Sequence, residues 1–201
     1  MKKKGFTLAE LLVIVAIIAV LVSAAIPVFS FQLEKSRRAV DMYTARSIAS
    51  ALTMGVNDGT VVFPENRNHC GIWVAIWYDN DRKPKGYTGN DMKNVTYFCG
   101  ADKGITINGT TNKKNWDVKN QNVEDLLARA GIDTDDLKVK CEKSSSSVGW
   151  DWIIINAGYE KNRFYTRIYS GLKTNEASSE ISKNPLGKSN IEKEMGIQSL
   201  S

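Results

Sequence analysis

The feature that most constrains this chain is an apolar run near its N-terminus, from Phe6 to Ile26. As a helix, 21 residues at about 1.5 Å per residue span roughly 32 Å, which matches the hydrocarbon core of a bilayer. Thirteen of these residues are Leu, Ile, Val or Phe, and each favours insertion by roughly 0.3–0.6 kcal/mol. The basic residues Lys2, Lys3 and Lys4 precede the run and hold that end on the cytoplasmic side. We therefore predict one membrane-spanning helix followed by an extracytoplasmic domain.

One acidic residue, Glu10, interrupts this run near its start. An acidic residue at the bilayer centre costs around 3 kcal/mol, which the apolar residues outweigh. Ionisable residues inside a membrane segment are candidates for function, although a carboxylate close to the interface can also reach water by snorkelling. An ordinary secretory signal has a shorter apolar core, of about 7–15 residues. The small residues of Val22–Pro27 nevertheless leave such a signal as an alternative.

The apolar run continues into a second helical segment. Apolar residues recur near helical spacing, which predicts an amphipathic helix that packs on the rest of the chain and carries its charge on the opposite face. These residues are Leu33, Val40, Tyr43, Ile48, Ala51 and Leu52. We expect one helix over residues 6–54, with a membrane part (6–26) and an amphipathic part (27–54). Pro27 removes a backbone hydrogen bond at the junction and should kink the helix there.

Residues 55–172 have the short apolar runs and the turn signals of an antiparallel β domain. Strands are predicted over residues 71–78, 94–99, 104–109, 137–141, 150–156 and 163–170, the last two as a hairpin. A short helix is predicted to begin at its cap Asn122 and to end at Gly131. Residues 173–201 are rich in Ser, Asn, Lys and Glu, so we expect poor order there. The predicted fold class is α+β, a long helix packed on a four- or five-stranded antiparallel sheet.

The cysteines Cys70, Cys99 and Cys141 all follow the membrane run, where a disulfide is permitted. If the strands at 71–78 and 94–99 pair antiparallel, Cys70 comes opposite Cys99, which predicts a disulfide between them. A bond between Cys99 and Cys141 is the alternative. A zinc site of these three residues with His69 lacks the Cys-x-x-Cys spacing, so we predict no metal.

Catalysis and nucleic-acid binding both find little support in the sequence. His69 is the single histidine, and it adjoins Cys70, so the two side chains would point apart. The net charge is +5, but the three leader lysines carry most of it, and without them the balance is +2. We therefore predict a protein that is not an enzyme, needs no cofactor and does not bind nucleic acid.

The stretch Gly5-Phe6-Thr7-Leu8-Ala9-Glu10 resembles the N-terminal signature of type IV prepilins and of type II secretion pseudopilins. The resemblance covers residues 1–54, and beyond them it extends only to the architecture of a pilin-like head. It implies a leader of residues 1–5, cut between Gly5 and Phe6 by a prepilin peptidase that also N-methylates Phe6. It further implies a filament of such subunits, built with an assembly ATPase and a membrane platform protein for adhesion, motility, secretion or DNA uptake. The chain would first lie in the cell membrane as a single-pass protein and then in an extracellular or periplasmic filament.

The chemistry of the motif agrees with this implication. Cleavage creates a cationic amine at Phe6, and the Glu10 carboxylate of a neighbouring subunit can pair with it. Opposite charges attract strongly where water is excluded, and either one alone is costly there. Glu10 would thus set the register of an incoming helix. Two alternatives are an exported binding module with an ordinary signal peptide and a membrane-anchored surface enzyme, and the mature N-terminus distinguishes them.

Two acidic clusters of the head are calcium candidates, because major pseudopilins bind calcium in a head loop. They are Asp79 with Asp81, and Asp133 with Asp135 and Asp136. Neither fits the spacing of a Ca²⁺-binding EF-hand loop, so we expect exposed turn residues instead.

Overall fold

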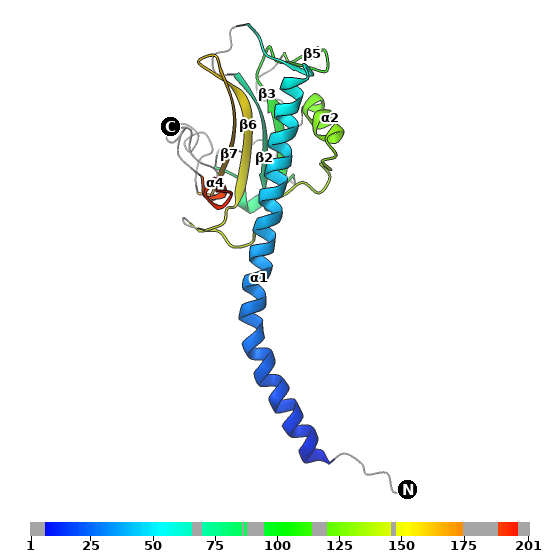
Figure 1. Cartoon of the computed structure of the whole chain (residues 1–201), viewed down its shortest axis with the longest axis vertical. Coiled ribbons are helices and arrows are strands. Elements are labelled where there is room, and N and C mark those ends of the chain that lie inside the picture. Colours follow the sequence, from blue (N-terminus) through cyan, green and yellow to red (C-terminus); the bar gives the residue numbers. More distant parts are fainter. Residues whose placement is uncertain are drawn as a thin grey trace, which may run out of the picture.

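The computed structural model describes residues 7–65, 70–85, 87, 95–113, 120–145, 148–174 and 189–196. Gly5, Phe6 and His69 lie outside these ranges. A long helix, α1, packs its C-terminal half against antiparallel sheets, while its N-terminal half projects away from them (Figure 1). This is the α+β, pilin-like architecture that the sequence predicts.

Helix α1 runs without interruption from Leu8 to Asn57. It ends where the Asp58 N–H donates to the Met54 carbonyl at 2.9 Å, three residues beyond the predicted end at residue 54. Pro27 lies inside the helix. Figure 1 shows a gradual bend between the projecting half and the packed half rather than a sharp kink.

The main sheet has the strand order β3-β2-β6-β7, and every neighbouring pair is antiparallel. Its strands are β2 (Cys70–Trp77), β3 (Tyr97–Ala101), β6 (Trp152–Glu160) and β7 (Arg163–Gly171). Lys161 and Asn162 join β6 to β7 and have φ angles of 48° and 61°. Positive φ at both loop residues is typical of a type I′ turn, whose twist suits a hairpin. The predicted hairpin is therefore confirmed.

A smaller antiparallel sheet and short helices complete the head. The sheet consists of β1 (Val61–Val62), β4 (Thr106–Ile107) and β5 (Thr110–Thr111). The predicted strand at 104–109 is thus β4 and its turn. The 3₁₀ helix η1 spans Asn80–Arg82, and α2 spans Gln121–Arg129. Asn120, not Asn122, caps α2, because its side chain accepts from the Asn122 and Val123 N–H groups.

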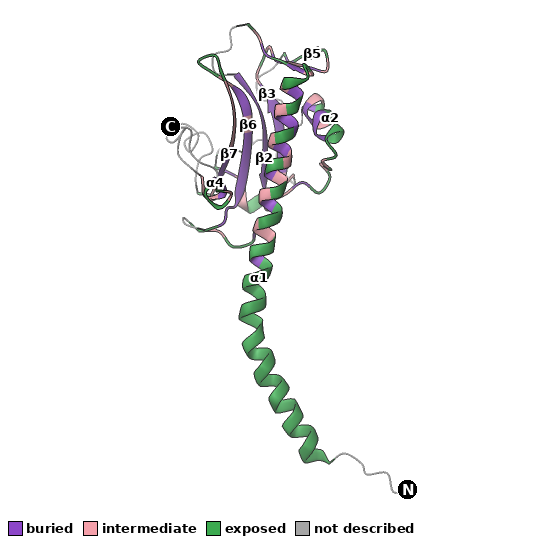
Figure 2. Ribbon diagram, viewed as in Figure 1, coloured by how far each residue is buried: buried purple, intermediate pink, exposed green. Residues whose placement is uncertain are grey.

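Both faces of the main sheet contribute to buried clusters, and β2 and β6 are largely purple in Figure 2. One face packs on α1 and α2, with Ile48, Leu52 and Leu127 against Val74 and Ile155. The other carries an aromatic cluster that includes Trp73, Trp77, Phe98, Trp152 and Tyr169. Burial on both sides explains why every residue of β2 is buried and why its sequence is apolar throughout rather than alternating.

The packed face of α1 differs from the predicted one. Ile48, Ala51 and Leu52 are buried, but Leu33, Val40 and Tyr43 are 42%, 45% and 73% exposed. Glu34 and Asp41 occupy the packed face instead and are almost fully buried. The predicted separation of apolar and charged faces is therefore wrong, because the apolar residues divide between two faces of the helix.

The predicted disulfides do not form, and all three cysteines are buried thiols. Cys99 lies in the middle of β3 and pairs with Val74, whereas Cys70 pairs with Tyr159 of β6. The Cys70–Cys99 prediction is wrong because β3 begins three residues later than predicted and continues to Ala101. Cys141 donates its thiol hydrogen to Glu34 Oε1 at 3.0 Å, which also overturns its pairing with Cys99.

Two further segments depart from expectation. Residues 137–141, predicted as a strand, belong to no helix or strand, although the Val139 N–H donates to the Trp77 carbonyl. Within the C-terminal region predicted to be poorly ordered, Asn190–Glu194 form helix α4. Ser189 and Glu192 cap this helix, and Ile191 is completely buried. Glu192 also accepts from the Ile168 N–H of β7, so α4 covers part of this sheet edge. Residues 175–188 and 197–201 lie outside the described ranges.

Helix α4 should contribute measurably to stability. We expect Ile191→Ala to lower the free energy of unfolding by about 2–4 kcal/mol, because it leaves a cavity in the core. Glu194→Ala is the control: it removes only the partly exposed ion pair with Arg38 and should change stability by less than about 1 kcal/mol. Urea unfolding of the full chain in detergent, followed by tryptophan fluorescence, measures both. Equal stabilities for Ile191→Ala and the wild type would contradict the packing of α4.

Candidate functional site

The projecting half of α1 presents its apolar side chains to the surroundings on all sides. Figure 2 shows this half exposed along its whole length. Among the described residues, α1 is the one helix long and apolar enough to cross a membrane, by length and composition. Apolar surface of this extent needs lipid or other helices around it.

A capping box closes the N-terminal end of this helix. The Glu10 N–H donates to Thr7 Oγ1 at 3.3 Å, and the Thr7 N–H donates to Glu10 Oε2 at 2.9 Å. The Thr7 hydroxyl donates to the same oxygen at 2.9 Å. These bonds satisfy backbone donors that the first helical turn leaves without intrahelical partners.

Sequence reasoning overlooked Thr7, although Thr7-Leu8-Ala9-Glu10 has the Thr-x-x-Glu spacing of a capping box. It also considered only water and a neighbouring subunit as partners of the Glu10 carboxylate. The structure corrects this point, because Glu10 already accepts hydrogen bonds from its own chain. Both bonds end on Oε2, and the residue remains exposed. Phe6, the other predicted member of the site, lies outside the described residues.

In the C-terminal half of α1, Asp41 attaches the helix to the head. Its carboxylate accepts from the Lys140 N–H at 2.7 Å, the Cys141 N–H at 3.0 Å and the Trp150 indole N–H at 2.9 Å. Burial raises the pKa of Asp41 to about 6, although these three donors favour the charged form. Donors from residues about 100 positions away thus pair with one side chain of the helix.

Glu34 makes a second attachment two helical turns before Asp41. Its Oε1 accepts from the Glu142 and Lys143 N–H groups at 3.1 and 3.0 Å, and from the Cys141 thiol. Burial alone would raise the pKa of Glu34, but these donors and Arg37 lower it overall. The same surroundings, burial first and Glu34 second, raise the pKa of Cys141 to about 12, which keeps this thiol protonated.

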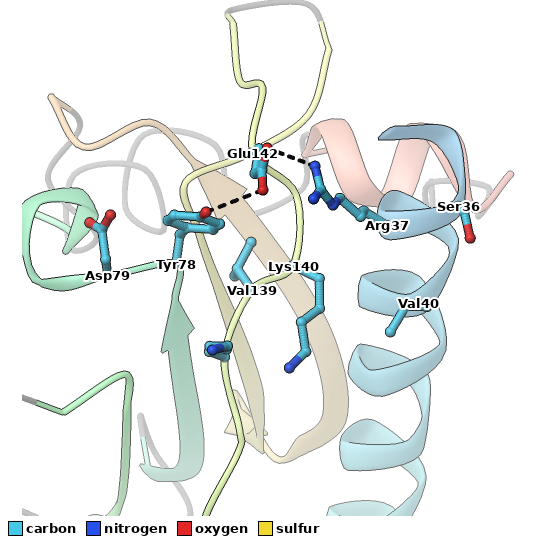
Figure 3. A pocket seen from close by; sticks show the side chains of 9 residues that line it. Ser36, Arg37, Val40, Tyr78, Asp79, Val139, Lys140 and Glu142 are labelled. Atoms are coloured by element: carbon cyan, nitrogen blue, oxygen red, sulfur yellow. Dashed lines mark hydrogen bonds and ion pairs between the residues drawn. The ribbon is translucent and has the colours of Figure 1, made fainter. Parts of the chain in front are cut away.

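Residues 137–143, which we call the strap, therefore bridge β2 and α1. A groove with a volume of about 630 Å³ lies between the strap, α1 and the end of β2. Figure 3 shows Glu142 between Arg37, at 2.7 Å, and the Tyr78 hydroxyl, at 3.4 Å. Together with Glu34 and Asp41, these contacts fix the direction in which the projecting helix leaves the head.

The acidic clusters considered as calcium candidates serve local structure. Asp79 Oδ1 accepts from the Asp81 and Arg82 N–H groups of η1, and Asp133 Oδ1 accepts from the Asp135 N–H. Asp136 pairs with Lys140 at 2.7 Å. No group of three or more His, Cys, Asp or Glu within the described ranges has a geometry that could hold a metal ion.

Comparison with protein-family models matches residues 1–26 to the prokaryotic N-terminal methylation motif. No curated protein and no solved structure matches the chain significantly. The match coincides with the projecting part of α1, its capping box and the residues before it.

The Asp41 attachment predicts a pH dependence of stability. Because the folded-state pKa of Asp41 is raised, the folded chain binds a proton more tightly than the unfolded chain, and stability should rise as the pH falls through 6. Between pH 7 and pH 5 the gain is on the order of 1 kcal/mol. Asp41→Asn should remove this gain in stability at low pH. The N–H₂ group of the introduced amide is itself a donor, so it would also face the three N–H donors from which the carboxylate accepts. Urea unfolding of both proteins at each pH measures the difference; an identical pH dependence would contradict the assignment.

Proposed function

We propose that this chain, whose N-terminus carries the prepilin-type cleavage and methylation signal of the type IV pilin and pseudopilin family, is a structural subunit of a filament. Its role is polymerisation through α1, in a pilus or pseudopilus that serves adhesion, motility, secretion or DNA uptake. The observation that carries the proposal is the conjunction of this signal with a capped, exposed, apolar helix that a separate head holds away from itself.

Before assembly, the projecting half of α1 anchors the chain in the cell membrane, with the head on the extracytoplasmic side. A prepilin peptidase cuts between Gly5 and Phe6 and methylates the new amine. Gly5 has no Cβ, so an extended backbone can enter a narrow catalytic cleft. Assembly depends indirectly on an ATPase and a membrane platform protein, while the chain itself acts without catalysis or a cofactor.

Glu10 has two tasks in this scheme. Through Oε2 it caps its own helix by accepting from Thr7. Being exposed, the carboxylate can also approach the Phe6 amine of the next subunit, since methylation preserves the positive charge. In apolar surroundings this pairing is strong, and an unpaired charge is costly. Residues 6 and 10 are four positions apart, so the pairing displaces neighbouring subunits by about 6 Å along the helix axis.

The mature N-terminus tests the processing step directly. We expect mass spectrometry of the native protein to show a chain that begins at Phe6 and carries one N-methyl group. A chain that retains Lys2–Gly5 would indicate a membrane-anchored protein of another kind. A chain that begins near Ala25 would indicate an exported module with an ordinary signal peptide. Either result would refute the proposal.

Glu10 variants test the pairing separately from the cap. Glu10→Ala should leave membrane insertion and cleavage largely intact but reduce incorporation into filaments by roughly 100-fold or more, because one buried charge is left alone. Glu10→Gln keeps an oxygen that can accept from Thr7 but loses the charge, and it should fail in the same way. Glu160→Ala, at an exposed position of the head, is the control and should assemble normally. Normal filaments from Glu10→Gln would show that only the cap matters.

A further inference from the structure

The edge strand β7 contains a four-residue repeat. Each unit consists of an arginine, an apolar residue, a tyrosine and a residue with a hydroxyl group. The units are residues 163–166, with the sequence Arg-Phe-Tyr-Thr, and residues 167–170, with the sequence Arg-Ile-Tyr-Ser. Side chains alternate between the two faces of a strand, so residues four positions apart point to the same face. Because β7 is the last strand of the main sheet, the two units present equivalent groups along one edge.

The second unit of the repeat holds the start of α4, which lies beside β7 in Figure 1. The Ile168 N–H donates to Glu192 Oε1 at 3.2 Å, and the Ile168 carbonyl accepts from the Ser189 hydroxyl at 2.8 Å. Arg167 Nε lies 3.5 Å from the same Glu192 oxygen. The Ser170 hydroxyl accepts from a backbone N–H of α4 at 3.2 Å. The arginine, the peptide groups of the apolar residue and the hydroxyl thus all take part in binding.

The first unit has the same peptide groups at the sheet edge. In an antiparallel pair, the peptide groups of an edge strand point alternately toward the neighbouring strand and away from it. Those of Ile168 point away, because they bind α4. Those of Thr166 and Phe164, which lie two and four residues earlier, therefore also point away from the sheet. Within the described residues, no hydrogen bond reaches these outward groups.

The side chains of the first unit are available as well. Arg163 is exposed and forms no ion pair with another residue that the structure describes, although Glu160 lies opposite it in the β6–β7 register. The Thr166 hydroxyl lies 2.9 Å from that of Thr53. A hydroxyl has two acceptor lone pairs, so Thr166 can still accept from a ligand. Every group that binds α4 in the second unit thus has a counterpart in the first.

We propose that residues 163–166 are a second seat for a helix start, and that its occupant is an acidic segment of a partner chain with the sequence Ser/Thr-x-x-Glu. The carboxylate of this segment accepts from the Phe164 N–H and pairs with Arg163. Its hydroxyl donates to the Phe164 carbonyl. This is the chemistry of residues 189–192, whose serine and glutamate form the capping box of α4. The second seat continues the seat of α4 along the same edge.

The charge of this edge favours an acidic occupant. Lys161 is exposed near Arg163, and hydrogen bonds between cationic side chains and a carboxylate are stronger than neutral ones. The chain's own α4 is already bound at the second unit, so the occupant comes from another chain. Charged residues also discourage edge strands from pairing with one another, but that role does not require the repeated order of groups. The inference does not depend on the proposed filament.

A peptide with the sequence of α4 is the probe for this seat. A synthetic peptide of residues 187–196 is titrated into the full-length protein in detergent, and saturation-transfer NMR of the peptide reports binding. We expect a saturable complex with a Kd below about 1 mM. Arg163→Gln should weaken binding about tenfold or more, because a charge-assisted contact is lost. A peptide with Glu192→Gln should lose affinity to a similar extent.

Two further variants identify the site. Arg129→Gln changes an exposed arginine of α2, which packs near the opposite sheet edge, and it should bind the peptide like the wild type. Arg167→Gln leaves the first unit intact and should bind at least as well as the wild type. Weak binding by Arg167→Gln with full binding by Arg163→Gln would show that the peptide displaces α4, which would overturn the second seat.

Two other results would also contradict the proposal. One is equal binding by Arg163→Gln and the wild type, which would leave protection of the edge as the role of Arg163. The other is a wild type that shows no saturable binding below about 1 mM peptide. Because Arg163 is exposed, Arg163→Gln should unfold in urea at the wild-type midpoint, so a folding defect is recognised. All of these measurements use detergent-solubilised protein, and failure to form filaments would leave them unaffected.

Discussion

Carboxylates on a largely apolar helix must find hydrogen-bond donors, and three of them on α1 organise this molecule. Glu10 accepts from Thr7 at the helix start, and Glu34 and Asp41 accept from backbone N–H groups of the strap. Removing a partner from a buried carboxylate is strongly destabilising. The two buried carboxylates, Glu34 and Asp41, therefore specify one orientation of the head on the helix. Glu10, which is exposed, marks a defined helix start.

These attachments divide α1 into faces with different tasks. One face packs on the sheet and carries Asp41, Ile48 and Leu52. Val40 and Tyr43 lie on another face of the helix and remain exposed despite their apolar character. The head thus contacts one face of the helix and leaves the other exposed.

Local signals were sufficient to predict part of this structure. The length of the Phe6–Ile26 run predicted the projecting helix, and strand periodicity with a short polar loop predicted the β6–β7 hairpin. Elsewhere the prediction failed because the partners of a residue lie far away in the sequence. Glu34 and Asp41 have the character of solvent-facing residues until Cys141, about 100 positions away, supplies their donors. The pairing of Cys70 with Cys99 failed because strand register depends on where β3 begins. The polar composition of residues 173–201 predicted poor order and gave no indication of α4. Ser189 and Glu192 nevertheless have the spacing of a capping box, as Thr7 and Glu10 do.

The most direct measurement is a filament structure at side-chain resolution. The account predicts that the Glu10 carboxylate of one subunit lies within about 4 Å of the methylated Phe6 nitrogen of the next, the distance of an ion pair. A filament in which Glu10 contacts only Thr7 of its own chain, with the neighbouring amine elsewhere, would contradict the account.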